Sequence, residues 1–191
     1  REERALALAS GNASRFVDAV TAARRAEPPI VPFHWELEFP EVFERGRPGF
    51  DAFIGNPPFM GGRNLSNVAG ASYVSWLVFQ HEGSGGAADL VAHFFRRGFD
   101  LLRENGALGF IATNTIAQGD TRAAGLTWIL ENGGQIYCAR RRVKWPGAAA
   151  VIVSVINIWK GPVAPVPELD GKGVDRVTPF LFHSGPTNDP A

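Results

Sequence analysis

The chain has little cysteine, no long apolar run and no excess of charge. A single cysteine, Cys138, in 191 residues excludes an internal disulfide and predicts a reducing, cytoplasmic environment. No segment approaches the ~20 apolar residues of a membrane span, and no signal-peptide pattern opens the chain, so no membrane partner is expected. Lys plus Arg equals Asp plus Glu, 19 each. Because domains that bind duplex DNA alone are usually basic, a chain with no net charge is not expected to bind a duplex by itself.

Two further absences concern the start of the chain. Residue 1 is Arg, and the only methionine is Met60, which predicts a piece of a longer protein. In many α/β domains a nucleotide is bound by a glycine-rich turn after the first strand and by an acidic residue that contacts the ribose. Neither feature is found before residue 50. Residues 83–86, Gly-Ser-Gly-Gly, follow no strand and are expected to form a flexible loop before a helix.

What is present allows one modest α/β domain with a real core, since 45% of the residues are hydrophobic and 20% charged. Helices are expected over 3–26, a glycine-rich excursion with a short amphipathic segment over 60–86, and further helices over 87–104 and 120–131. Strands are expected at 50–54 (buried), 107–113, 135–143 and 149–159, the last two joined by a turn at 145–147. Beyond Gly161, prolines at 162, 165, 167 and 179 predict a linker or the approach to another domain.

The segment Asn56-Pro57-Pro58-Phe59, called here the Asn-Pro-Pro-Phe loop, directly follows the first expected strand. Two prolines with fixed φ and no N–H make a rigid turn at the carboxyl end of that strand, where ligands bind in open α/β sheets. An exocyclic amine on a planar base is a poor nucleophile until two acceptors take hydrogen bonds from it. The Asn56 side-chain oxygen and the Pro57 carbonyl can be those acceptors, and Phe59 can stack on the ring. The alternative is a stiff loop with Phe59 in the core.

The loop resembles motif IV of the amino-methyltransferases that use S-adenosylmethionine. Residues 32–43 resemble the segment before this motif in large prokaryotic restriction-modification and phage-exclusion adenine methylases, and residues 88–95, 109–119 and 144–151 resemble motifs V, VI and VIII, in order. The resemblance implies the C-terminal half of a Rossmann-like class I methyltransferase sheet, α/β with a terminal antiparallel hairpin. The expected division is a lead-in segment at 1–47, the target-base half of the catalytic domain at 48–160, and a linker or following domain at 161–191.

The same resemblance implies roles for single residues. The four residues of the Asn-Pro-Pro-Phe loop would be catalytic, with Asn56 also next to the cofactor. Phe94 would contact the cofactor adenine, although it falls on the helix face expected to pack against the sheet, where core packing is the alternative. Trp145 would stack on the target base opposite Phe59, with turn packing as the alternative. Asp89 is expected to cap or start the helix that carries Phe94.

Two other residue sets have no implied catalytic role. Residues 140–144 read Arg-Arg-Arg-Val-Lys. Because side chains alternate along a strand, at most half of them would point one way, either as a solvated edge that discourages strand pairing or as phosphate contacts. The four histidines have no metal-ligand spacing and are expected to be structural or at the surface, so no metal is expected.

The predicted function is therefore methyl transfer from S-adenosylmethionine to the exocyclic amine of adenine in DNA. Partners would be double-stranded DNA with the target adenine flipped out, and the rest of the same polypeptide, without which the fragment is expected to be inactive. Methylation of a cytosine carbon needs a cysteine nucleophile, and Cys138 lies inside an expected strand. A methyltransferase for an RNA base or a protein glutamine amide, and a non-catalytic interaction fragment, are the alternatives.

Overall fold

The computed structural model describes residues 25, 33–44, 46–145, 151–162 and 164–185. The chain divides into two units, Arg1–Arg45 and Gly46–Ala191, close to the expected boundary after residue 47. The expected helices at 3–26, apart from residue 25, and the turn residues 146 and 147 lie outside the described residues. In the first unit, α3 (Trp35–Glu38) and α4 (Pro40–Phe43) are single helical turns, and the rings of Trp35 and Phe39 stack with centroids 5.9 Å apart.

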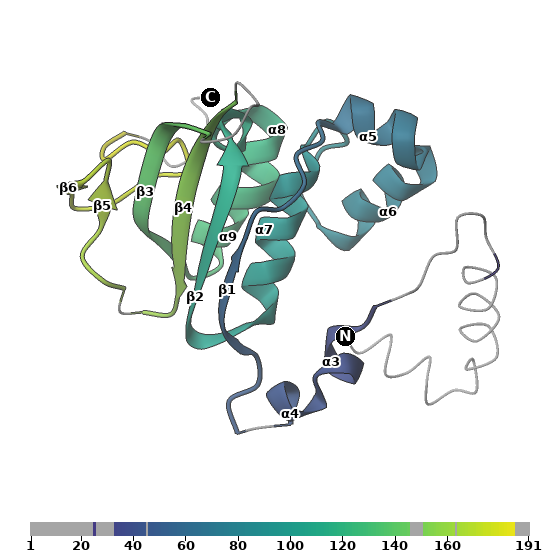
Figure 1. Ribbon diagram of the computed structural model, residues 1–191, viewed down its shortest axis with the longest axis horizontal. Coiled ribbons are helices and arrows are strands. Elements are labelled where there is room, and N and C mark those ends of the chain that lie inside the picture. The colour runs from purple at the N-terminus through teal and green to yellow at the C-terminus, as the bar shows by residue number, and fades with distance from the viewer. Residues whose placement is uncertain (1–24, 26–32, 45, 146–150, 163, 186–191) are drawn as a thin grey trace. The chain divides into compact units, whose positions relative to one another are not determined.

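The second unit is built on a six-stranded sheet with the order β1-β2-β4-β3-β5-β6 (Figure 1). Strand β1 (Phe50–Gly55) runs parallel to β2 (Leu102–Thr113), and β4 (Ile152–Lys160) lies antiparallel between β2 and β3 (Gly134–Lys144). Strands β1, β2 and β3 therefore end at the same edge of the sheet. The predicted α/β class with a terminal antiparallel hairpin is confirmed.

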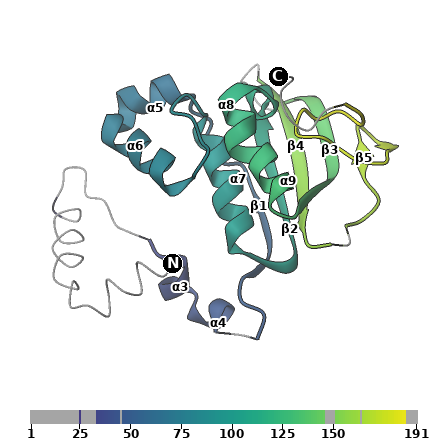
Figure 2. The same cartoon turned by 180° about the vertical axis from the view of Figure 1, so that it is seen from behind.

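The long helices cover one face of this sheet, as Figure 2 shows from behind. Helix α7 (Leu90–Leu101) precedes β2. A continuous helical run of α8 (Gly119–Arg122), a π-helical turn (Ala123–Thr127) and α9 (Trp128–Glu131) precedes β3, which confirms the helix expected at 120–131. Gly98 lets α7 approach β2, since a Cβ there would lie 2.6 Å from Leu108 Cδ1. The fully buried side chains between helices and sheet include Val91, Phe95, Leu108, Ile129, Ile156 and Ile158.

Helix α7 ends three residues earlier than the sequence predicts. The Lys160 ammonium on β4 donates hydrogen bonds to the carbonyl oxygens of Phe99, Asp100 and Leu102, at 2.9, 3.3 and 2.7 Å. A cation at a helix C-terminus satisfies the last carbonyls and complements the helix dipole. The chain therefore leaves the helix at Leu102 rather than at the Asn105-Gly106 pair expected to stop it.

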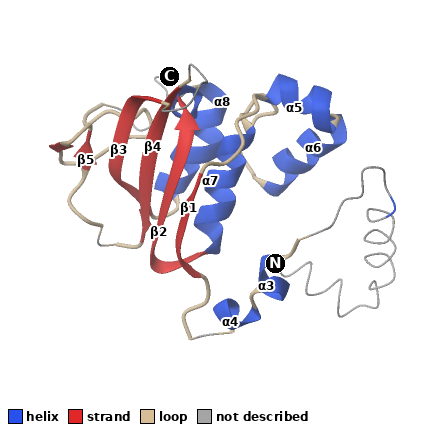
Figure 3. Ribbon diagram, viewed as in Figure 1, coloured by secondary structure: helices blue, strands red, loops and turns tan. Residues whose placement is uncertain are grey.

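Strand β1 is not buried as expected. Its side chains alternate between a face that packs on the core, with Phe53, and a face on which Ile54 is 91% exposed. Among the described residues no strand pairs with its outer edge, and no described helix crosses the face opposite α7 (Figure 3). A short apolar strand thus borders an open edge and an open face.

Residues 164–185 belong to the second unit, whereas the sequence predicted a linker or the start of a following domain. Strand β5 (Glu168–Leu169) pairs with β3, and β6 (Lys172–Gly173) pairs with β5. The two residues between them, Asp170 and Gly171, have φ values of 53° and 82°, which fits the Asp-Gly preference of two-residue hairpins. Burial of Leu169, Val177 and Leu181 explains why this proline-rich segment folds onto the sheet.

The expected excursion between β1 and α7 contains two helices, α5 (Gly62–Ala69) and α6 (Ala71–Gln80). On α6 the rings of Tyr73 and Trp76 stack at 5.7 Å. Within the described part of the chain, no helix is both long and apolar enough to cross a membrane.

Candidate active site

The Asn-Pro-Pro-Phe loop begins where β1 leaves the sheet. The pairing of β1 with β2 ends at Gly55, opposite Phe110, because the two following prolines have no N–H to continue the ladder. Pro57 is buried and Phe59 is half-buried against the core, whereas Asn56 is exposed. The loop is thus anchored by its rings and presents the Asn56 amide to solvent at the carboxyl end of a strand.

The residue after the loop is held by the start of α7. Asp89 Oδ1 accepts hydrogen bonds from Met60 N at 2.9 Å and from Val91 N at 3.0 Å, and Leu90 N donates to Met60 O at 2.9 Å. Asp89 therefore caps the helix, as predicted. The sequence did not predict the contact of Asp89 with Met60, because a local pattern indicates a helix cap but not a partner 29 residues away.

Phe94 does not face the sheet. It is 42% exposed, whereas its neighbour Phe95 is fully buried, so the expected helix face and the core-packing alternative are both wrong for Phe94. It lies four residues after Leu90, about 6 Å along the helix, and Leu90 is bonded to Met60. The structure therefore brings an exposed aromatic ring to the α7 turns next to the Asn-Pro-Pro-Phe loop.

Trp145 is the first residue after β3, and its backbone N–H donates to Val151 O at 3.0 Å. The side chain is half-buried. Strands β2 and β4 separate β3 from β1, so three strand spacings, about 14 Å, lie between the ends of β1 and β3. Trp145 and Phe59 thus share one edge of the sheet, with no ring contact between them in the described structure.

Polar side chains lie between these two aromatics, after the end of β2. Thr113 Oγ1 is 2.7 Å from Thr115 Oγ1, and Ser154 Oγ donates to Asn114 Oδ1 at 3.3 Å. Asn114 and Thr115 are exposed. Hydroxyl and amide groups at this edge could hydrogen-bond a planar ligand held next to the loop.

Two of the histidines form a buried pair, His81 at the end of α6 and His93 on α7. His81 Nδ1 and His93 Nδ1 are 2.6 Å apart, and the rings stack at 4.9 Å. Burial, with the nearby Arg96 charge, lowers the pKa of His81 to about 3 and that of His93 to about 4. Both rings are therefore neutral near pH 7 and act structurally. Among the described residues, no three His, Cys, Asp or Glu side chains are grouped to hold a metal.

Comparison with known proteins places this loop in a family. Residues 13–133, more than half of the chain, match the Eco57I restriction-modification methylase family. The chain belongs to this family. The match includes the Asn-Pro-Pro-Phe loop, Asp89 and Phe94, and ends before Trp145.

Solved structures with the fold of this Eco57I-family chain include the type IIL restriction-modification enzyme MmeI in complex with DNA. The TM-score is 0.56 at 22% identity, over 70% of this chain and 20% of MmeI; the chain thus corresponds to about a fifth of that enzyme's length. A protein of Listeria monocytogenes assigned to the class I S-adenosylmethionine-dependent methyltransferases aligns with a TM-score of 0.44 at 15% identity, over 63% of this chain and 34% of that protein. A search of curated protein sequences found no significant match.

Proposed function

We propose that this Eco57I-family chain is the target-base half of the catalytic domain of an adenine-specific DNA methyltransferase. The complete enzyme transfers a methyl group from S-adenosylmethionine to the exocyclic amine of an adenine. The observation that carries the proposal is the exposed Asn56 amide beside the buried Pro57 at the carboxyl end of β1, in a restriction-modification methylase family.

The loop acts by accepting hydrogen bonds from the amine. The Asn56 side-chain oxygen and the Pro57 carbonyl each take one N–H, which moves the nitrogen out of conjugation with the ring and makes its lone pair nucleophilic. These bonds strengthen as conjugation is lost, so they stabilise the transition state more than the ground state. Phe59, packed on the core by one part of its ring, stacks on the base.

The cofactor is held only in part by this chain. Bound S-adenosylmethionine supplies an electrophilic methyl group, and the exposed ring of Phe94 is suited to contact its adenine. Met60, four residues after Asn56, is hydrogen-bonded to Leu90 in the first turn of α7, so the loop that carries Asn56 ends next to the helix that carries Phe94. The described residues thus provide one wall of a cofactor site.

The rest of the site comes from the rest of the polypeptide. Among the described residues no strand lies along the outer edge of β1, and Ile54 exposes apolar surface on the open face; an open apolar edge readily pairs with another strand. A further strand and its helices would cover this surface and supply the cofactor loop. The fragment alone is therefore inactive and binds S-adenosylmethionine weakly.

The DNA partner must present an unpaired base. A duplex hides the adenine amine, so the target nucleotide has to leave the stack. Phe59 and Trp145 would stack on it, each contact being worth ~1–3 kcal/mol. Since the ends of β1 and β3, which lead to these two residues, are about 14 Å apart, the flipped base would enter the space over the end of β2 between them.

The test is product analysis with the complete protein and isotopically labelled S-adenosylmethionine. Label in N6-methyladenine of DNA is expected, lost in Asn56→Ala and kept in Asn64→Ala, which removes an exposed amide of α5. Both variants should retain the wild-type melting temperature. Label in RNA, in a protein glutamine or in cytosine, or full activity of Asn56→Ala, would overturn the proposal.

A further inference from the structure

The basic run on β3 contains a β-bulge. Arg140 pairs with Val155 and Val143 pairs with Val153, so Arg141 and Arg142 together lie opposite Ser154. Arg142 has a φ of 54°, in the left-handed region that is unfavourable for a residue with a Cβ. Bulges are frequent beside active sites, where they redirect a side chain.

Arg141 holds this bulge in place. Its backbone N–H donates to Asp170 Oδ1 at 2.7 Å and its Nε donates to Asp170 Oδ2 at 2.9 Å, while a terminal nitrogen donates to Leu181 O at 3.0 Å. This arginine is therefore occupied by a structural contact. The turn between β5 and β6 supplies the carboxylate, since it contains Asp170, and the segment after β6 supplies the Leu181 carbonyl.

The other two arginines remain exposed. In a regular strand Arg140 and Arg142 would share one face, but the bulge puts Val143 on the face of Arg140 and moves Arg142 out of the ladder into solvent. The Arg140 side chain is 65% exposed, and its nearest carboxylate oxygen, on Glu168, is 3.9 Å away. That separation leaves its guanidinium free to form closer hydrogen bonds with a ligand.

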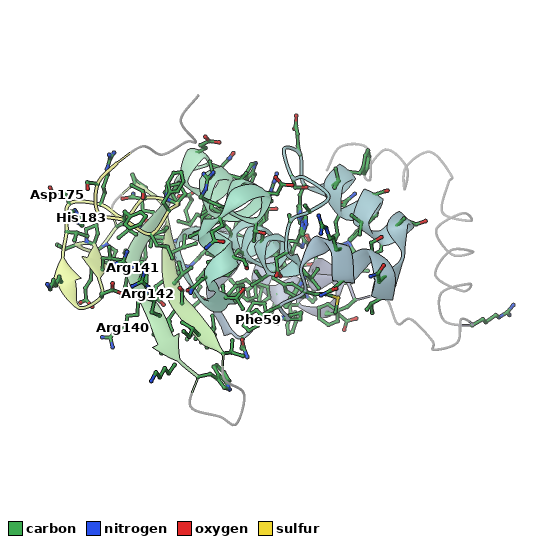
Figure 4. The ribbon with its side chains drawn as sticks, turned by 90° about the horizontal axis from the view of Figure 1, so that it is seen from above. Phe59, Arg140, Arg141, Arg142, Asp175 and His183 are labelled. Carbon is green, nitrogen blue, oxygen red and sulfur yellow. The ribbon has the colours of Figure 1, made fainter. Side chains whose placement is uncertain are left out.

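Both exposed arginines lie toward the carboxyl end of β3, at the sheet edge that carries the Asn-Pro-Pro-Phe loop. Figure 4 looks onto this edge and shows the three arginines together on β3, apart from Phe59. Three strand spacings, about 14 Å, separate β3 from β1. This distance is comparable to the ~12 Å width of the DNA major groove, so a duplex whose base reaches the loop has its backbone within reach of β3.

We propose that Arg140 and Arg142 bind phosphate groups of the DNA backbone that lies across the major groove from the flipped base. The inference rests on the proposed function, which makes DNA the partner. Guanidinium groups form charge-assisted, bidentate hydrogen bonds with phosphate oxygens, and such contacts fix the orientation of a duplex without reading its sequence. The bulge, with Arg142 in the left-handed region, turns this second cation away from the ladder.

Salt dependence of DNA binding by the complete protein tests this role. The double variant Arg140→Gln/Arg142→Gly removes both charges and keeps the bulge, because glycine adopts a positive φ without strain. Each lost phosphate contact reduces the slope of log Kobs against log salt by about 0.9, so a reduction of about 1.8 is expected. The pair Arg140→Lys/Arg142→Lys should retain the wild-type slope. Arg47→Gln, at the opposite end of β1, is the matched control and should also leave it unchanged.

The outcomes separate this inference from the proposed function. A wild-type protein that methylates DNA, with the same slope in the double variant and in Arg47→Gln, would overturn the phosphate role alone. A wild-type protein that neither binds nor methylates DNA would overturn both. If the double variant does not fold, the single variant Arg140→Gln decides, with an expected slope reduction of about 0.9 and an unchanged slope as the contrary result.

Discussion

Asp89 joins the end of the Asn-Pro-Pro-Phe loop to helix α7. One carboxylate oxygen accepts the backbone N–H of Met60, directly after the loop, at 2.9 Å, and that of Val91, in the first turn of α7, at 3.0 Å. The backbone N–H of Asp89 in turn donates to Thr121 Oγ1 at 3.0 Å. A helix cap thus also fixes the residue at which the Asn-Pro-Pro-Phe loop ends, so the position of Asn56 depends on the Asp89 side chain.

Asp89→Ala is expected to lower the free energy of unfolding by about 0.5–2 kcal/mol, the range for loss of a helix cap. It should also reduce kcat more than it raises KM for DNA, because the loop loses one of its fixed ends. Asp89→Asn keeps an acceptor oxygen and should retain most of the stability and activity. Urea unfolding measures the loss of stability, and steady-state methylation measures the loss of activity. The control is Asp175→Ala, which removes an exposed carboxylate. Equal losses of activity in Asp89→Asn and Asp89→Ala would show that charge, rather than the hydrogen bonds, matters.

Local sequence patterns predicted much of this architecture. Strand β1, the helical run at 119–131 and the β3–β4 hairpin follow from apolar periodicity and turn residues, and the Asn-Pro-Pro-Phe loop follows from proline geometry. The end of α7 could not be predicted from local patterns, because the Lys160 that caps it is 59 residues beyond Leu101. The β5–β6 hairpin had a local signal in Asp170-Gly171, but the surrounding prolines obscured it.

The side-chain directions at the site were the hardest to predict. Phe94 and Phe95 are neighbours in sequence, and neighbours on a helix point about 100° apart, so only one of them could face the sheet. Nothing local decides which. The bulge at Arg141 and Arg142 depends on Asp170, which arrives from another hairpin, so simple alternation along β3 could not reveal it.

Phe94→Ala should affect cofactor binding more than folding. Because Phe94 is 42% exposed, its truncation is expected to change the free energy of unfolding by about 1 kcal/mol or less. Truncation of the buried Phe95, which packs edge-on against Phe110 at 5.3 Å, should cost about 3–5 kcal/mol. Calorimetry on the complete protein should show a raised Kd for S-adenosylmethionine in Phe94→Ala. An unchanged Kd would remove Phe94 from the cofactor site.

The His81–His93 pair should make the fold sensitive to acid. Burial, with the charge of the other ring and of Arg96, lowers the pKa of His81 from 6.5 to about 3; burial and Arg96 lower that of His93 to about 4. Below pH 6.5 the unfolded chain binds protons that the folded chain does not, so the free energy of unfolding should fall as the pH decreases from 6.5 toward 4. Above 6.5 both states are neutral, and this dependence disappears.

A double variant, His81→Phe/His93→Phe, tests the assignment. It keeps two stacked rings and removes both titrating groups, so its stability should depend less on pH between 4 and 6.5 than that of the wild type. Urea unfolding at pH values on both sides of 6.5 measures this. The same pH dependence in both proteins would place the acid sensitivity elsewhere.

Trp145→Ala is expected to weaken capture of the target base more than it weakens the fold. The residue is half-buried at a hairpin turn, and its hydrogen bond to Val151 uses the backbone, so truncation leaves that bond intact. Loss of one stacking contact, ~1–3 kcal/mol, corresponds to about a 5- to 150-fold decrease in methylation of duplex DNA at low DNA concentration. A fluorescent adenine analogue at the target position reports the same step, because its emission rises when it leaves the stack and is quenched by an aromatic ring.

Trp145→Phe distinguishes stacking from turn packing. Phenylalanine keeps an aromatic face but less volume, so it should restore most of the methylation and the quenched state of the analogue, with a melting temperature close to that of Trp145→Ala. If Trp145 instead packs the turn, Trp145→Ala should melt at a clearly lower temperature, and Trp145→Phe should recover stability without recovering base capture. That second pattern would leave Phe59 as the stacking residue at this edge of the sheet and would require the opposite face of the base to be covered from outside residues 46–185.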